Sequence, residues 1–352
     1  MSKYKEISQT LLDQKELLAE QIVRRQYDLQ PILLERYGQA GWNAALRDQK
    51  YHLTYLAQTI AFNQAGLFVN YIEWSRQVLE AYGLTSELFI TTIECTQEIL
   101  AKHFDGEQGK IIRRFLQTAL ARLQSPPDPS FSQPIVDENQ AYGKLAKQYL
   151  ETLLVPDRSQ ARRLILDAVK NGVSVKDIYL NVFQPVQHEI GRLWQTNQIS
   201  VAQEHYATAV TQQIMSQLYE HIFATPKTGK VLVAACVGDE LHEIGIRMVT
   251  DLFEMAGWDT FYLGANTPAA DIIQTINSHQ AHLLAASVTL LTHLDRLEEL
   301  IVRVRNSAAG AVKILVGGYP FNLAPNLWRE IGADGSAPDA ETGILVAQQL
   351  CA

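Results

Sequence analysis

Cysteine is scarce in this chain of 352 residues, which contains only Cys95, Cys236 and Cys351. Three cysteines cannot build a disulfide framework, and their spacing matches no zinc motif. No stretch approaches the roughly 18 uninterrupted apolar residues of a transmembrane helix, and the opening Met-Ser-Lys-Tyr-Lys-Glu does not resemble a signal peptide. We therefore expect a reduced, cytoplasmic setting and no membrane partner.

Positive charge is also in short supply. The chain has 30 Lys and Arg against 38 Asp and Glu, which gives a net charge of −8. This balance argues against a large nucleic-acid surface. Hydrophobic residues make up 47% of the chain, and its length suits two or three domains of roughly 100–200 residues each.

A dinucleotide fingerprint is missing as well, because no G-x-G-x-x-G follows the apolar run 230–237. That run is rich in β-branched and small residues and predicts a strand buried on both faces. Strands and helices then alternate, which predicts an α/β doubly wound (flavodoxin-like) parallel sheet. The expected strands are 230–237, 259–263, 282–287, 312–316 and 334–336, and the expected helices are 243–256, 269–278, 295–305, 325–331 and 340–350.

A proline-rich segment marks the clearest domain boundary. Residues 125–134 contain four prolines among serines, which cannot continue a helix and suit a semi-rigid linker. The predicted organisation is an all-α N-terminal domain at 1–124, a linker at 125–137, a four-helix bundle at 138–224 and the sheet domain at 229–352.

Four helices are expected in the bundle, at about 139–154, 158–171, 174–195 and 200–223. Ser174 with Asp177, and Ser200 with Gln203, have the spacing of a capping box and indicate two of the helix starts. Short loops between successive helices imply antiparallel neighbours.

The N-terminal domain shows helical periodicity but no defensible helix-turn-helix pattern. Its aromatic and polar residues at helical spacing are typical of an ordinary core, and a pocket for a flat conjugated ligand is the alternative interpretation. These residues are His52, Tyr55, Phe62, Phe68, Tyr71, Trp74 and Tyr82.

Three short motifs fall at the expected carboxyl ends of the strands, where ligands bind in open parallel sheets. They are Glu240-x-His242-x-x-Gly245, Ser287-x-Thr289 and Gly317-Gly318. In order and spacing they resemble the cobalamin-binding domain of methionine synthase, mutases and related proteins, and the resemblance covers residues 230–352. With the preceding bundle it extends over about 140–352.

The resemblance implies that His242 is the lower axial ligand of a cobalamin cobalt, with the nucleotide tail displaced into the sheet. Glu240 is placed to hold the other ring N–H of that imidazole, although family members often carry Asp there. Glycines at 245, 317 and 318 would leave room for the tail, and Ser287 could donate a hydrogen bond to it. The alternative for His242 is an exposed loop histidine.

The sequence His188-Glu189-Ile190-Gly191 repeats His242-Glu243-Ile244-Gly245 letter for letter. The first copy lies within a predicted helix and follows no strand, so its backbone cannot open to admit a cofactor tail. We expect His188 to be a residue of the bundle.

One end of the bundle combines a large ring, an apolar residue, a carboxylate and an imidazole: Trp194, Val201, Glu204 and His205. This set is similar to the upper cap of the light-sensing adenosylcobalamin repressors, in which such residues hold the 5′-deoxyadenosyl group. The resemblance implies that the tryptophan stacks on adenine and that the glutamate accepts from ribose hydroxyls. Ordinary bundle packing is the alternative.

Two departures from the repressors matter. Their basic DNA-reading domain is replaced by a neutral helical segment, so direct DNA binding is not expected. Instead we expect residues 1–124 to bind a protein partner. Gln195 stands where some repressors carry a second histidine. The layout is also similar to photocobilin-type receptors, which pair cobalamin with a bilin, but no residue motif assigns a bilin site here.

Three functions fit these observations. The first is a cobalamin-dependent sensor, responsive to light, with adenosylcobalamin favoured over methylcobalamin. The second is a corrinoid methyl carrier for a separate methyltransferase, and the third is an interaction module with no cofactor. No catalytic residue is predicted and turnover is not expected, while the sequence leaves a homo-oligomer open.

Overall fold

The computed structural model describes residues 2–223 and 225–352. The first residue of the predicted N-terminal domain and residue 224, the last of the predicted bundle, lie outside this description. The chain divides into two compact units, residues 1–129 and 130–352. The finer division of the chain into four domains stays a prediction.

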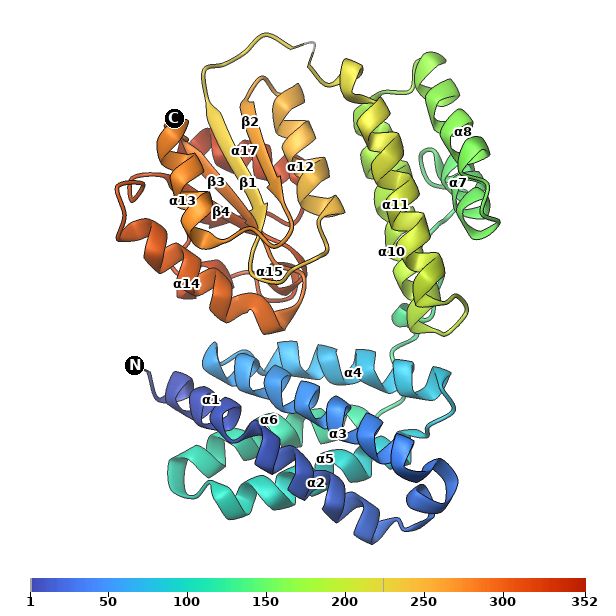
Figure 1. Ribbon diagram of the computed structural model, residues 1–352, viewed down its shortest axis with the longest axis vertical. Coiled ribbons are helices and arrows are strands. Elements are labelled where there is room, and N and C mark those ends of the chain that lie inside the picture. Colours follow the sequence, from blue (N-terminus) through green and yellow to red (C-terminus); the bar gives the residue numbers. More distant parts are fainter. Residues whose placement is uncertain (1, 224) are drawn as a thin grey trace. The chain divides into compact units, whose positions relative to one another are not determined.

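The N-terminal unit is all-α, as expected (Figure 1). Its helices are α1 (Lys3–Asp13), α2 (Lys15–Leu29), α3 (Ile32–Ala61), α4 (Ala65–Ala81), α5 (Ser86–His103) and α6 (Gly106–Leu123). Leucines and isoleucines at helical spacing form the core, among them Leu11, Leu18, Ile22 and Leu56. Helix α3 is interrupted at Gly38, whose φ of 57° is favourable for glycine.

Most of the seven aromatic and polar residues named from the sequence are buried in the core of this unit. Tyr55 stacks on Tyr71 with ring centroids 3.7 Å apart, and Nδ1 of His52 lies 2.8 Å from the hydroxyl of Tyr71. Burial lowers the pKa of His52 to about 4, so its imidazole is neutral at pH 7. Tyr82 does not belong to this core, because 63% of it is exposed.

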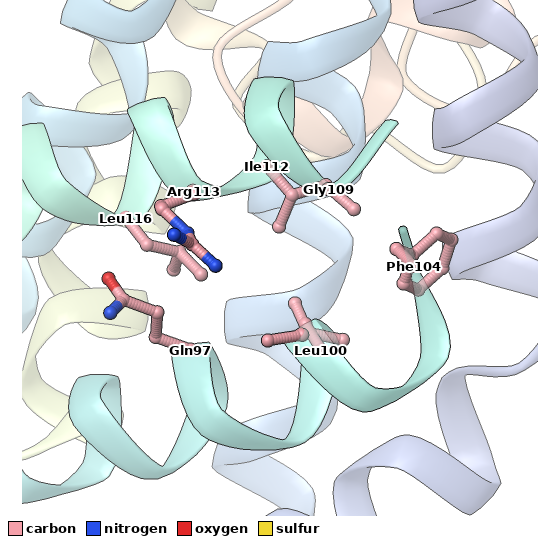
Figure 2. Close-up of a pocket in the computed structure, with 8 residues that line it drawn as sticks. Gln97, Leu100, Phe104, Gly109, Ile112, Arg113 and Leu116 are labelled. Carbon is pink, nitrogen blue, oxygen red and sulfur yellow. The ribbon is translucent and has the colours of Figure 1, made fainter. Parts of the chain in front are cut away.

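A small pocket of about 20 Å³ lies between α5 and α6 and has room for about one water molecule. Figure 2 shows that Gln97 and Leu100 of α5 face Ile112, Arg113 and Leu116 of α6 across it. The pocket is lined by none of the seven aromatic and polar residues named from the sequence.

The second unit begins with the helical bundle. Its helices are α7 (Gly143–Leu154), α8 (Arg158–Lys170), α9 (Val175–Ile178), α10 (Gln184–Gln195) and α11 (Val201–Gln217). Between α9 and α10 the chain forms one π-helical turn, Tyr179–Phe183, so the predicted third helix is continuous but not wholly α-helical. The Ser200–Gln203 capping box is present, and Ser174 accepts from the backbone N–H of Asp177.

Two predicted bundle boundaries are wrong. The first helix starts at Gly143 rather than 139, because residues 137–142 form turns and Tyr142 takes a left-handed conformation with φ 57°. The last helix ends at Gln217, and a 3₁₀ turn at Tyr219–His221 follows where helix was expected to 223.

The sheet is parallel with the strand order β2-β1-β3-β4-β5, as expected for a doubly wound fold. Its strands are β1 (Val231–Cys236), β2 (Asp259–Gly264), β3 (Leu283–Ser287), β4 (Lys313–Gly317) and β5 (Gly335–Ser336). Its principal helices are α12 (Ile244–Met255), α13 (Ala269–Ser278), α14 (Leu294–Arg305), α16 (Leu327–Glu330) and α17 (Ala340–Leu350).

Helices cover both faces of this sheet (Figure 1). Helices α12 and α17 pack on the face formed by Leu232, Ala234 and Cys236, while α13 and α14 lie on the other side. Met248 and Leu252 of α12 also belong to the buried core of the bundle. Helix α12 is therefore shared between the sheet and the bundle. No helix in the described ranges is both long and apolar enough to span a bilayer.

Candidate functional site

The three motifs meet at the carboxyl edge of the sheet. Strands β1, β3 and β4 are neighbours, and their register aligns Cys236 with Ser287 and Ser287 with Gly317. The loops that follow these strands therefore begin side by side (Figure 1). This edge, between β1 and β3, is the switch point at which doubly wound sheets bind ligands.

Glu240 holds His242 in one orientation. Oε1 of Glu240 lies 2.5 Å from Nδ1 of His242 and accepts from the backbone N–H of His242 at 3.1 Å. The glutamate is fully buried, whereas 58% of the histidine side chain is exposed. With Nδ1 engaged by the carboxylate, Nε2 is the ring nitrogen left to bind a ligand.

The second carboxylate oxygen of Glu240 binds the loop that follows β3. Oε2 accepts from the backbone N–H groups of Thr289 and Leu290, at 2.8 and 2.9 Å. Nδ1 of His293 lies 3.4 Å from the same oxygen. Burial alone would raise the pKa of Glu240, but the hydrogen bonds from His242 and the amides, together with the nearby His293, outweigh it and hold the pKa well below its usual range.

Glu240 in turn acts on the histidine. The hydrogen bond to Glu240 raises the pKa of His242 against the lowering effect of burial, and the charge of Glu204 adds to the rise. Glu204 belongs to α11, so the capped end of the bundle lies close enough to act on the His242 loop. His293 was missed by sequence reasoning because it belongs to none of the three motifs.

The motif glycines differ in their surroundings. A Cβ added at Gly245 would meet no atom within 4 Å, and at Gly317 only the carbonyl oxygen of Ala337, at 3.9 Å. Both positions are open, as room for a tail requires. At Gly318 the structure adds a second requirement for glycine: its φ is 107°, and an added Cβ would lie 1.9 Å from the carbonyl oxygen of Val288. Whether Gly318 also leaves room for a cofactor tail stays a prediction.

Ser287 and Thr289 lie at the end of β3 and in the loop after it. The carbonyl oxygen of Ser287 accepts from the backbone N–H of Val237, which joins the ends of β1 and β3. Thr289 contributes its backbone N–H to Glu240. The hydrogen bond from the Ser287 hydroxyl to a cofactor stays a prediction.

The four cap residues gather at the turn between α10 and α11, as predicted. Val201 is 52% exposed, and the side chain of His205 is 75% exposed. Oε1 of Glu204 accepts from the hydroxyl of Thr208 at 3.0 Å, and its Oε2 lies 3.4 Å from Nε2 of His205. Trp194 is half-buried at the end of α10.

Glu243 was not recognised from the sequence, yet it joins three segments. Its Oε1 accepts from Nε2 of Gln212 on α11 at 2.7 Å. Its Oε2 accepts from the hydroxyl of Tyr262 on β2 at 2.9 Å and from the backbone N–H of Ala265 at 3.0 Å. The residue next to His242 thus ties the bundle to the sheet.

Two further residues of α12, each four positions after the last, also contact the bundle. Nη2 of Arg247 donates to the hydroxyl of Ser216 at 2.8 Å, and Asp251 accepts from the hydroxyl of Tyr179 at 2.8 Å. Residues 243, 247 and 251 lie on one face of a helix. We call them the α12 stripe. It fastens the sheet to α11 and to the π-helical turn.

His188 lies mid-helix on α10, away from any strand end, as expected. The partial shielding of its ring lowers its pKa. The adjacent Glu189 is buried and binds Arg192 through both carboxylate oxygens, at 2.9 and 2.6 Å. The first copy of the tetrapeptide therefore takes part in helix packing.

Residues 230–345 match a family model described as the B12 binding domain, and residues 145–219 match a second model of the same description. The structure of the monomethylamine corrinoid protein of Methanosarcina barkeri superposes with a TM-score of 0.54 at 20% identity. The match covers 60% of this chain and 100% of that one. At this identity the likeness establishes the fold.

Two kinds of protein are found among the curated relatives, corrinoid proteins and a repressor. Dimethylamine corrinoid protein 2 of Methanosarcina mazei is 29% identical over 129 residues, 36% of this chain and 58% of that protein. Monomethylamine corrinoid protein 1 of Methanosarcina acetivorans is 26% identical over 197 residues, 53% of this chain and 88% of that protein.

The second kind is a repressor. The HTH-type transcriptional repressor CarH of Myxococcus xanthus is 24% identical over 155 residues, 44% of this chain and 51% of that protein. The chain thus spans little more than half the length of the M. mazei and M. xanthus relatives.

Proposed function

This chain belongs to the B12-binding domain family through residues 145–219 and 230–345, and from that premise we propose that it is a cobalamin-binding sensor that responds to light. The observation that carries the proposal is the geometry of His242. An exposed imidazole whose other nitrogen is held by a fully buried carboxylate is prepared to ligate a metal.

The residues around His242 fit a corrinoid. Gly245, three residues after the histidine, and Gly317, at the end of β4, both leave open space, which we assign to the displaced nucleotide tail. Oε2 of Glu240 fixes the loop after β3, so the floor of the site keeps its shape when the ligand arrives. Ser287, at the end of β3, is the donor we assign to the tail.

The cap favours adenosylcobalamin over methylcobalamin. Trp194 offers a flat ring for an adenine, Val201 an exposed apolar surface, and Glu204 an acceptor for hydroxyls. A methyl group could neither stack on the tryptophan ring nor donate a hydrogen bond to the glutamate. When bound, adenosylcobalamin supplies a cobalt–carbon bond that light can break.

The response would pass through the contacts between bundle and sheet. Trp194 and Glu204 would hold the upper group, and the loss of those contacts would shift the balance between two arrangements of the bundle. The α12 stripe joins that bundle to the loop of His242. We assign the output to a protein partner of residues 1–124, and direct DNA binding forms no part of the proposal.

A corrinoid methyl carrier is the second candidate. The names of the M. mazei and M. acetivorans relatives favour it, since both are corrinoid proteins of methylamine systems. A carrier would prefer methylcobalamin and would need a partner methyltransferase. A bilin bound as a second chromophore is the third candidate.

One experiment separates these candidates. The chain is purified with adenosyl- or methylcobalamin in darkness, and absorption spectra are recorded before and after green light. The sensor binds adenosylcobalamin with its benzimidazole off and histidine on the cobalt, and its spectrum changes irreversibly on illumination. Preference for methylcobalamin with methyl transfer to an added acceptor supports the carrier, and a new red band with biliverdin supports the bilin. A protein that ignores every corrinoid overturns all three.

A further inference from the structure

The linker is held by two buried pairs of the same design, a glutamate followed three residues later by an arginine. On α4 the pair is Glu73 and Arg76, with side chains 3% and 1% exposed. On α10 it is Glu189 and Arg192, with side chains 5% and 10% exposed. Buried pairs of this kind need additional hydrogen bonds to offset the loss of water, and the linker backbone provides them.

The pair on α4 binds the start of the linker. Oε1 of Glu73 accepts from the backbone N–H of Asp128 at 2.9 Å. Nη1 of Arg76 donates to the carbonyl oxygens of Ser125 and Leu123, at 2.9 and 3.3 Å. All of these contacts lie inside the N-terminal unit.

The pair on α10 binds the end of the linker in the same way. Oε2 of Glu189 accepts from the backbone N–H of Ile135 at 2.8 Å, and Nη1 of Arg192 donates to the carbonyl oxygen of Ser132 at 3.3 Å. Each pair thus takes one N–H and at least one carbonyl from the linker. All of these contacts lie inside the second unit.

Only the 3₁₀ turn Pro129–Phe131 separates Asp128 from Ser132 along the chain. Arg192 stands two residues before Trp194 on α10. We propose that the linker is a fastened strap whose two Glu-x-x-Arg pairs act together, so that a displacement of α10 at the cap reaches α4. A flexible linker would not transmit the same displacement to α4.

Substitution of Ile135 by proline tests the coupling, because it removes the N–H that Glu189 accepts and leaves both ion pairs intact. Ile135→Ala is the matched control: it keeps the N–H, and the side chain it shortens is already 43% exposed. The readout is amide hydrogen exchange in the protein without cofactor. We expect exchange at Asp128 to accelerate at least tenfold in Ile135→Pro and less than twofold in Ile135→Ala.

Exchange at Ile72, in the core of α4, should keep its wild-type rate, which separates loosening of the strap from unfolding. Glu189→Gln, which keeps the side-chain volume, is the second variant and should also accelerate Asp128. If Asp128 stays protected in both variants, the two pairs are independent and the coupling is wrong. If Asp128 and Ile135 exchange at unfolded rates in the wild type, the linker is not fastened. Neither outcome depends on cobalamin binding.

Discussion

The tetrapeptide His-Glu-Ile-Gly occurs at 188–191 and at 242–245, and the two copies serve different purposes. The first lies inside α10, where regular helical hydrogen bonds fix its backbone. The second follows β1 and leads into α12, so its histidine stands at the carboxyl edge of the sheet. Identical letters thus give a packing element in one place and a candidate ligand in the other.

The glutamates of the two copies show the same contrast. Glu189 turns to Arg192 on its own helix and to the linker, whereas Glu243 reaches α11, β2 and the loop after β2. The difference arises from the preceding element. A strand end places the next residues among several loops, whereas a helix gives Glu189 an ion-pair partner one turn away on the same helix.

The largest expected effect is on stability, and it should distinguish the two glutamates. Glu189→Ala leaves Arg192 buried without its partner, which typically costs about 3–5 kcal/mol of unfolding free energy. Glu243→Ala removes hydrogen bonds to three donors at a half-buried position, at an expected cost of about 1–3 kcal/mol. Denaturant unfolding monitored by circular dichroism measures both. Equal losses would show that the contrast between the copies is not energetic.

The hydrogen bond between Asp251 of α12 and Tyr179 of the π-helical turn should make a pH-dependent contribution to stability. Burial raises the pKa of Asp251 from 3.8 to about 6, and Tyr179, Arg247 and Glu254 are the polar and charged groups that act on it. The folded state therefore binds the proton more tightly, so the stability that this group contributes is complete below about pH 4 and is lost as pH rises through 6. The loss is at most about 3 kcal/mol.

Asp251→Asn isolates this term because asparagine does not titrate. The stability of the variant relative to wild type should increase between pH 4 and pH 7, measured by urea unfolding at each pH. A constant difference across that range would mean that Asp251 titrates normally in the folded protein.

The two histidines should differ in cobalamin binding. His242→Ala is expected to weaken adenosylcobalamin binding about a hundredfold, or about 2.7 kcal/mol, and to abolish the histidine-on spectrum. His188→Ala keeps both the affinity and the spectrum. Titration followed by absorption spectroscopy measures the two together. An unchanged spectrum in His242→Ala would remove the ligand assignment.

The smallest effects concern the glycines of the two copies. An added Cβ meets nothing within 4 Å at Gly191 or at Gly245, so alanine at either helical position should raise the unfolding free energy by about 0.5–1 kcal/mol. Only Gly245→Ala should also weaken cobalamin binding, because the open space there is assigned to the cofactor tail. Thermal unfolding and the same titration give both quantities.

The sequence predicted the sheet well because its three central strands, β1, β3 and β4, are short apolar runs that are largely buried. It also predicted that the three motifs meet, because the carboxyl ends of parallel strands lie at one edge of the sheet. It could not predict the role of Glu243, whose partners lie far along the chain, or that of His293, which itself belongs to none of the motifs. For Gly318 it did not reveal the close contact with Val288, because space for a ligand and that contact both require glycine.

The π-helical turn Tyr179–Phe183 was also not predicted from the sequence, although Pro185 follows it closely on α10. It has a consequence for evolution by insertion and deletion, because such a turn holds one more residue than the α-helix it interrupts. Loss of a single residue there would restore regular helix and leave downstream side chains such as Glu189 and Trp194 facing their present neighbours. Loss of a residue from the regular helix α10 would instead rotate everything downstream of it by about 100°. The π-helical turn is thus a place where this helix tolerates a change of length without reorienting the cap.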